Sequence, residues 1–427
     1  MISCKLQMSK NPKKVNHEGI RNLLKLAKKS EYYRDFIFEF SKKSRKPIIT
    51  SGNNHLFDIK NLAVDTKKLI YYFFDGGGVN YLNIFPFTKK EWEKRNEYIA
   101  DCYKLVGISN KDSAWISLPY GPWIDGHMSQ DAVRLIGCNF LPATLSNNQI
   151  MMQRIWQEAQ QMDVNLIISS PSILRFIEKS INGLELSSKI NKAILSKDLV
   201  SKRYKKYFKN KYNIDVFNVY QVDNIFIGIE CKYHNGFHYD PDRVLIEIVN
   251  ERSHLEMVKY GNMLITSLIS EAIPVIRYKI NNKAKINFNL CRCGSNWPRL
   301  NIKETNIDKK YEISGGVNFS SSQISNALSV LKPKFKECLL EIIENKEGKC
   351  LMNFYIKFKN SDIEKIKNEK KFIEKIKNSL ENMSLNFKDA IFEGYAEIVI
   401  YFRVSNSKKS KKINLIKIKD KRILNQK

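Results

Sequence analysis

Three cysteines and a histidine have the types and spacing of metal ligands. Six residues separate Cys231 from His238 in "CKYHNGFH", and one residue separates Cys291 from Cys293 in "CRC". Three thiolates and one imidazole suit a tetrahedral structural zinc ion. The sequence therefore predicts a zinc site within segment 231–293, with His238 or His234 as the imidazole ligand. The alternative is that these are ordinary buried or surface residues.

A run of three glycines could approach a phosphate group. Gly76, Gly77 and Gly78 follow a short aromatic, strand-like stretch in "YYFFDGGGVNY" (Tyr71–Tyr81). A phosphate loop normally also holds Ser, Thr or Lys, and this one has only backbone N–H donors. Asp75 directly precedes the glycines, and its carboxylate would repel phosphate. We interpret the loop as the remnant of a nucleotide site, or as a rebuilt one.

A third cluster could hold an acyl or aryl group. The stretch "YGPWIDGHMSQD" contains Tyr120 and Trp123, which could form an aromatic wall, together with Asp125 and His127. A histidine at such a wall can act as a general base, because its pKa lies close to neutral pH. The alternative is a histidine that only packs, or faces solvent, beside a turn.

The elements that must position these residues are of α/β type. Short apolar runs such as "SAWISLPY", "CNFLPAT" and "VNLIISS" alternate with helical stretches such as "KEWEKRNEYIADCYKLVG". An amphipathic helix is expected within His17–Phe40. After about Ile307 the pattern changes to two strands around Gly348, a helix from Ser361 to Met383 with a capping box, and the strand "YAEIVIYFR".

Several ordered stretches together resemble the phenylacetate–coenzyme A ligase family of adenylate-forming enzymes. They are "LLKLAKKSEYYRDF", "YGPWIDGHMSQDAVRLIGCNFLPAT", "IISSPSIL", "GFHYDPDRVLIEIVN", "GNMLITSLISEAIPVIRYK", "CRCGSNWPRL" and "GGVNFSSSQI". The resemblance covers nearly the whole chain. It implies a large domain and a small C-terminal domain that rotates between two half-reactions, and it favours His238 of "GFH" as the zinc ligand. It also places Tyr120 and Trp123 at the acyl pocket.

The resemblance implies a reaction. A carboxylate attacks the α-phosphate of ATP to give an acyl-adenylate, and a thiol, usually that of coenzyme A, then accepts the acyl group. That chemistry requires a phosphate loop, a magnesium ion to offset phosphate charge and a lysine near the adenylate.

The sequence departs from the family at the residues that bind the nucleotide. The motif typified by "YGMTE" is "YQVDN" (Tyr220–Asn224), so Asn224 replaces a glutamate, and the adjacent Asp223 could compensate. Asn282 replaces the ribose-binding aspartate. The hinge "GRxDD" falls on Ile307–Lys310. The C-terminal lysine falls on Asn414 when "DKR" (Asp420–Arg422) anchors the alignment, and Lys411 or Lys412 could serve only with a gap. Each lost charged hydrogen bond is worth about 1.5–3 kcal/mol, so the sequence predicts weak ATP binding.

Composition narrows the function class further. The chain has 427 residues and a net charge of +28, with 43% hydrophobic residues. Lysine is abundant throughout, and affinity for anionic cofactors explains the basicity as well as nucleic-acid binding does. No apolar run reaches the roughly 18–20 residues that a membrane span needs, and the N-terminus has no secretory pattern. We expect a cytoplasmic protein without a membrane partner, and a homodimer is compatible with this interpretation.

The sequence thus predicts an α/β protein with an adenylate-forming-type domain at 1–306 and a small, mobile α+β domain at 307–427. We expect it to act on a carboxylic acid or its acyl thioester, of aromatic or other acyl type, in a biosynthetic pathway. Its partners would be that small molecule and coenzyme A or a carrier protein. Two alternatives are ATP-independent acyl transfer and a non-catalytic pathway partner.

Overall fold

The computed structural model of the chain describes residues 16–34, 50–51, 56–75, 83–144, 149–181, 189–197, 199–250, 257–303, 310–313, 317–329, 335, 337–346, 349–359, 369–383, 385–405 and 415–422. The glycine run 76–78, the hinge residues Ile307–Lys309, the capping box of Ser361 and Glu364, and Asn414 lie outside these ranges. Helix α1 (His17–Ala27) ends earlier than the stretch His17–Phe40 suggested.

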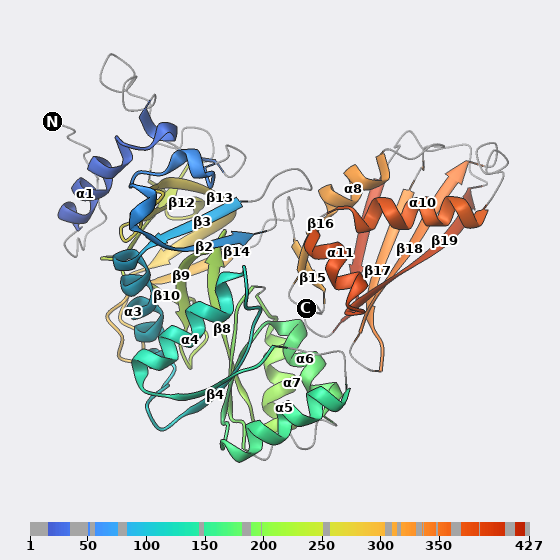
Figure 1. Ribbon diagram of the computed structural model, residues 1–427, viewed down its shortest axis with the longest axis horizontal. Helices are drawn as coiled ribbons and strands as arrows, with labels where there is room; N and C mark the ends of the chain where they lie inside the picture. The colour runs from blue at the N-terminus through green and yellow to red at the C-terminus, as the bar shows by residue number, and fades with distance from the viewer. Residues whose placement is uncertain are drawn as a thin grey trace.

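A twelve-stranded sheet forms the large part of the molecule (Figure 1). One half is parallel, in the order β5, β4, β6, β7, β8, with bounds Asn139–Pro142, Ser113–Ser117, Leu166–Ser169, Lys192–Leu195 and Asp215–Val222. The other half is antiparallel and continues through β9 (Ile225–Glu230), β10 (Phe237–His238), β14 (Arg299–Lys303), β13 (Val275–Asn287), β12 (Gly261–Ser267) and β11 (Val244–Val249). Strand β1 (Thr50–Ser51) pairs with β13.

The parallel strands are apolar because both of their faces are buried. Alternate residues of β4 point to opposite cores. Ala114 and Ile116 pack with helices α3 (Lys89–Leu105) and α4 (Ile124–Ile136), whereas Trp115 packs on the opposite face. Helices α5 (Gln149–Gln161), α6 (Pro171–Ser180) and α7 (Lys202–Tyr212) cover that face. The expected helix and strands of this region are confirmed.

A two-stranded ribbon carries the chain toward and away from the glycine loop. It consists of β2 (Leu69–Asp75) and β3 (Asn83–Thr88), which pair antiparallel. Two short helical turns, Ile59–Asn61 and Thr66–Lys68, precede it. The ribbon lies against the start of α3, where Thr88 caps the helix by accepting a hydrogen bond from the N–H of Glu91 at 3.1 Å.

The C-terminal elements build a separate sheet with its own core. The sheet has the order β19 (Ala396–Ser405), β18 (Cys350–Lys359), β17 (Glu337–Glu344), β20 (Leu415–Asp420). Helices α8 (Ser321–Ser329), α10 (Glu369–Glu381) and α11 (Leu385–Phe392) pack on it, and the ribbon β15 (Lys310–Ile313) and β16 (Val317–Ser320) precedes it. The fold class is thus the expected one, a large α/β part with a small α+β part, and the boundary near Ile307 stays a prediction.

Helix α6 touches the C-terminal elements (Figure 1). The Oγ of Ser172 donates to the carbonyl of Ile313 at 3.2 Å, and the Nζ of Lys179 donates to the carbonyl of Asn345 at 2.6 Å. Glu344 lies 3.6 Å from the Nε of Arg175 and 3.4 Å from the Nζ of Lys179. All three of these side chains are at most 22% exposed, so the ion pairs are shielded from solvent.

Candidate functional site

The candidate site lies at the carboxyl edge of the parallel strands. Loops that follow parallel strands meet at one edge of the sheet, where ligands of such sheets bind. Here Ser117 and Ser169 end β4 and β6 and are paired in register, and Ser196 donates its N–H to the carbonyl of Ser169 at 3.0 Å. Strand β8 runs beyond this edge and carries the motif Tyr220–Asn224.

Asp125 forms a buried ion pair with Lys197 at this edge. The side chain of Asp125 is 2% exposed and that of Lys197 is 14% exposed. The Nε2 of Gln221 donates to Asp125 Oδ1 at 2.7 Å. Lys197 follows β7 with a φ of 79°, a left-handed conformation that a lysine rarely adopts outside functional or strongly constrained sites. Asp125 already faces an ammonium group. The geometry therefore favours a role for Asp125 in holding Lys197 in place, rather than a role as a proton acceptor.

His127, two residues after Asp125 on α4, lies in an aromatic cluster. Its ring centroid is 5.3 Å from that of Phe73 and 5.2 Å from that of Tyr120. The Nε2 is 3.1 Å from the carbonyl of Gly121, so this nitrogen is the one that carries the hydrogen. The Tyr120 hydroxyl is buried without a hydrogen-bond partner among the described residues, and burial raises its pKa. Trp123 precedes α4 and is half-buried.

Asp223 and Asn224 form the tight turn between β8 and β9. Their φ angles are 44° and 60°, and only these two residues separate the paired ends Val222 and Ile225. Such two-residue turns need left-handed residues and favour Asn and Asp. The presence of asparagine at position 224 is therefore explained equally well by the geometry of this turn and by the loss of a metal ligand. The Asp223 carboxylate accepts the Tyr278 hydroxyl at 2.6 Å, and burial, with this carboxylate, raises the pKa of Tyr278.

The structure joins two other residues of the expected nucleotide site. The Nδ2 of Asn282, on β13, donates to the hydroxyl of Tyr220, on β8, at 3.2 Å. Tyr220 is buried and packs on Phe237 at 5.4 Å. Asp75 is the last residue of β2, and Gly76, Gly77 and Gly78 lie beyond the described residues. How the glycine loop relates to Tyr220 and Asn282 therefore stays a prediction.

The four expected zinc ligands come together between β9, β10 and the turn before β14. The ligand atoms of Cys231, His238, Cys291 and Cys293 all lie within 4.8 Å of one another. The Sγ atoms of Cys231 and Cys291 are 3.7 Å apart, and Cys293 Sγ is 3.5 Å from His238 Nε2. Zinc bonds of about 2.3 Å to sulfur and 2.05 Å to nitrogen would give tetrahedral edges of about 3.8 and 3.6 Å. The donor set therefore fits a zinc ion.

Neighbouring groups orient these ligands. The Nδ1 of His238 lies 3.1 Å from the carbonyl oxygen of Trp297. A hydrogen bond here fixes the tautomer of the ring and leaves Nε2 available to bind a metal. Burial lowers the pKa of His238 and raises that of Cys231 to about 12, so a bound cation would have to displace the Cys231 proton. A Cβ on Gly228 would lie 2.1 Å from the His238 carbonyl, so β10 can approach β9 only at a glycine.

His234, the alternative imidazole, lies elsewhere. Its Nδ1 is 3.2 Å from the Nζ of Lys205 and 3.4 Å from the carboxylate of Glu230. Of the two histidines, only His238 belongs to the cluster. The choice of His238 over His234 follows from the short pairing of β10 with β9 and β14.

Sequence reasoning missed four residues that shape this region, namely Arg95, Lys197, Gln221 and Tyr278. Lys197 could have been found, because it comes just after the apolar run "KAIL", where a parallel strand ends. Arg95 and Glu91 are charged residues on the buried face of α3, which is a second usable signal. Gln221 and Tyr278 carry no local signal.

Comparison with known proteins agrees with this architecture. No protein-family profile matches the chain. A 2-hydroxyisobutyryl-CoA ligase in complex with 2-HIB-AMP and CoA, in the thioesterification state, superimposes with a TM-score of 0.75 at 12% identity, covering 95% of this chain and 89% of that one. The same ligase in the postadenylation state gives 0.62 at 12% identity, covering 96% and 89%. The chain thus has the fold of the adenylate-forming coenzyme A ligases.

A sequence relative narrows the resemblance. Phenylacetate–coenzyme A ligase of Escherichia coli (strain K12) is 19% identical over 286 residues, which are 65% of this chain. The chain spans 63% of that relative's length. The resemblance to the phenylacetate–coenzyme A ligase family is thus confirmed at the level of sequence similarity and fold. Among the described residues, no helix is long and apolar enough to cross a membrane.

Proposed function

We propose that this chain is an acyl-activating or acyl-transferring enzyme that acts on a carboxylic acid or its thioester. Coenzyme A or a carrier protein would be the thiol partner, and an aromatic or other acyl acid of a biosynthetic pathway the substrate. The observation that carries the proposal is the buried Lys197–Asp125 pair at the carboxyl edge of an adenylate-forming fold. Strained, buried charges at such an edge are typical of functional sites. A cytoplasmic location goes with this proposal.

Lys197 would supply the cation that this chemistry needs. The C-terminal lysine of the family falls on Asn414, whereas Lys197 lies in the large domain and is held by Asp125, whose other carboxylate oxygen accepts a hydrogen bond from Gln221. In the ligase reaction, a substrate carboxylate oxygen forms a bond to the α-phosphorus of ATP and pyrophosphate leaves. A fixed ammonium group beside the reacting oxygens would offset the charge that develops there. Tyr120, Trp123 and His127 would form the aromatic side of the acyl site.

The nucleotide would be bound weakly. Asn224 and Asn282 offer amides where carboxylates are expected, and both have structural roles, in a tight turn and in a hydrogen bond to Tyr220. Asp223 is already engaged by Tyr278. If ATP binds, magnesium would have few anionic ligands on this face. This supports a reworked site in which classical adenylation is not the main activity.

A second candidate is acyl transfer without ATP. It is favoured by the arrangement of the C-terminal elements, because the chain superimposes better on the thioesterification state of the hydroxyisobutyryl-CoA ligase than on its postadenylation state, with TM-scores of 0.75 and 0.62. The shielded contacts of Glu344 with Arg175 and Lys179 hold that arrangement. A C-terminal part held in this way would serve the thioester step.

Two assays separate the candidates. Release of pyrophosphate with a panel of carboxylic acids, ATP and magnesium identifies a ligase, and turnover of acyl thioesters without ATP identifies an acyltransferase. Lys197→Met should lower whichever activity is present by at least about 100-fold. Lys104→Met, which alters an exposed pair with Asp101, should leave the activity unchanged. If neither assay shows turnover, the third candidate, a non-catalytic pathway partner, replaces the enzyme proposal.

The Cys3His cluster is proposed to hold one structural zinc ion. Four protein ligands would fill a tetrahedral shell and leave no open position for substrate. Bound there, zinc would join the β9–β10 connection to the segment before β14. It would stabilise this end of the antiparallel half-sheet rather than take part in the reaction.

A further inference from the structure

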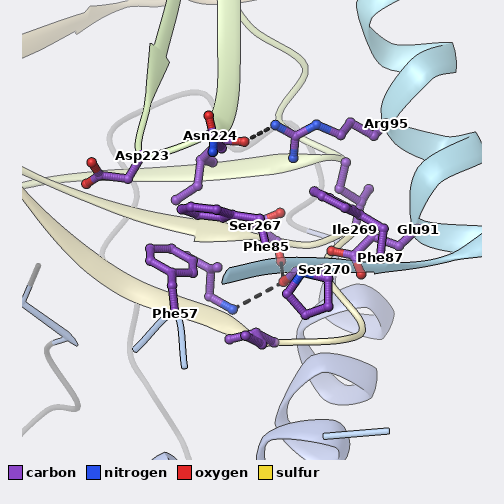
Figure 2. A pocket seen from close by; sticks show the side chains of 14 residues that line it. Phe57, Phe85, Phe87, Glu91, Arg95, Asp223, Asn224, Ser267, Ile269 and Ser270 are labelled. Atoms are coloured by element: carbon purple, nitrogen blue, oxygen red, sulfur yellow. Dashed lines mark hydrogen bonds between the residues drawn. The ribbon is translucent and has the colours of Figure 1, made fainter. Parts of the chain in front are cut away.

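A pocket lies between α3, β3, the turn of β8–β9 and the loop before β13 (Figure 2). The pocket is partly open to solvent and has a volume of about 30 Å³. Its walls are largely apolar, with Phe57, Phe85 and Phe87 among them, and Figure 2 shows Arg95 and Glu91 on the side of α3. A water molecule needs about 10–15 Å³ of such volume. The pocket therefore has room for a group of only a few heavy atoms.

Arg95 brings a positive charge to this pocket. The residue is 8% exposed. Among the described residues its guanidinium makes hydrogen bonds to the carbonyl of Asn224 and to the Sδ of Met128, and it lies over the ring of Phe87 at 5.2 Å. It forms no ion pair within that part of the chain. An arginine has five N–H donors, and a thioether is a weak acceptor. Donor capacity is therefore left over beside the cavity.

The carboxylates around Arg95 do not supply the missing anion. The other acidic groups near Arg95 and Glu91 have partners of their own: Asp125 with Lys197, Asp223 with Tyr278, and Glu271 with Lys90. Glu91 remains, one turn before Arg95 on α3. Burial raises the pKa of Glu91 to about 7, although the N–H of Ala272 donates to it at 2.9 Å. Below neutral pH this carboxyl group is therefore largely uncharged.

We propose that this pocket binds the carboxylate group of a small organic acid, with Arg95 as its cation. A planar carboxylate matches the guanidinium fork, and a charge-assisted pair in a buried site is strong. The aromatic and aliphatic walls would receive a short alkyl chain, and the small volume excludes a nucleotide or an aryl acid as a whole. This site is separate from the aromatic cluster of Tyr120, Trp123 and His127, and it does not depend on the proposed enzymatic activity.

The test is calorimetric titration of the full chain with formate, acetate and propionate, without nucleotide. Ligands of three to five heavy atoms in a well-formed pocket are expected to bind with a dissociation constant of about 1 mM or lower. Arg95→Met should weaken acetate binding at least tenfold. Arg134→Met, which removes a 66% exposed arginine from α4, is the matched control and should bind acetate like the wild type. Absence of saturable binding by the wild type, or unchanged binding by Arg95→Met, overturns the proposal.

The pH dependence supplies a second test that does not require Arg95→Met to fold. Ionised Glu91 would compete with the ligand for Arg95. With a pKa of about 7 for Glu91, its neutral fraction falls about tenfold between pH 6 and 8, and acetate affinity should fall by up to the same factor. Glu91→Gln should bind acetate equally at both pH values. An affinity that is the same at both pH values in the wild type, or that keeps its pH dependence in Glu91→Gln, contradicts the proposal.

Competition identifies the source of the carboxylate. If an acid that the protein converts also displaces acetate, the pocket holds the substrate's own carboxylate. If acetate binding is unaffected by that acid, the ligand is a free small anion. Either result supports a carboxylate site at Arg95.

Discussion

The Asp125–Lys197 pair allows a stringent test of how the carboxyl edge is held together. Both groups are almost fully buried, with exposed fractions of 2% and 14% for the side chains. Removing one partner of a buried pair typically costs about 3–5 kcal/mol, because the other charge stays buried without a counter-charge. Asp125→Asn should therefore lower the free energy of unfolding of the large part by about 3–5 kcal/mol. Gln221 can still donate to the new amide, so the loss comes from Lys197.

The complementary variant refines this expectation. Lys197→Met leaves Asp125 charged but still hydrogen-bonded by Gln221 at 2.7 Å, so its cost should lie at the lower end of that range, about 3 kcal/mol. The double variant Asp125→Asn/Lys197→Met buries no charge, and it should be more stable than either single variant. Such non-additivity is the signature of residues in direct contact.

The measurement is urea unfolding followed by circular dichroism and tryptophan fluorescence, with the first transition assigned by comparing the two signals. Glu93→Gln serves as the control, because Glu93 pairs with Lys89 at 3.9 Å on the exposed face of α3, with side chains 57% and 78% exposed. Such a surface pair is worth about 0–1 kcal/mol. An Asp125→Asn variant no less stable than the Glu93→Gln control would refute the buried pair as described.

Four further results are expected. Metal analysis of protein purified without chelators should find about one zinc per chain, and Cys293→Ser should lose it and unfold at lower temperature; a metal-free, equally stable wild type would contradict the site. Calorimetry with Mg–ATP should give a dissociation constant weaker than about 1 mM, whereas micromolar binding would show a rebuilt nucleotide site. Because burial raises the folded-state pKa of Glu91 from 4.5 to about 7, its contribution to stability is full below pH 4.5 and is lost as pH rises through 7. The loss should be up to about 3 kcal/mol, and Glu91→Gln should abolish this part of the pH profile. Glu344→Gln should loosen the contact with Arg175 and increase proteolytic cleavage near residues 304–310; an unchanged cleavage rate would argue against that contact as the restraint.

Much of the fold could be predicted because its determinants are local. The apolar runs of β4 and β6, and the helical pattern of α3, carry their periodicity in ten or twenty adjacent residues. Ordered landmarks from "LLKLAKKSEYYRDF" to "GGVNFSSSQI" then pointed to the adenylate-forming architecture, which the superpositions confirm. The C-terminal strands were also readable, because β17 and β18 flank a turn in a single hairpin.

For the candidate site, the sequence could suggest individual residues, but the contacts between them depend on the fold. Cys291 and Cys293 are adjacent enough to suggest a metal from spacing alone, but their distance from His238 depends on the pairing of β10 with β9 and β14. Asp125 was a candidate from its motif, whereas its partner Lys197 stands 72 positions later and reaches it only because β7 follows β4 and β6 in the sheet.

The sequence by itself determined the α/β class, the family resemblance and the residue types available for chemistry. Only the tertiary structure decided which charges are paired, that Asp223 and Asn224 form a left-handed turn, and that Arg95 lines a cavity while forming no ion pair with another described residue. The physical reason is range. Secondary structure follows from periodicity among neighbours, whereas ion pairing and burial follow from strand order and packing, which join residues far apart in the chain.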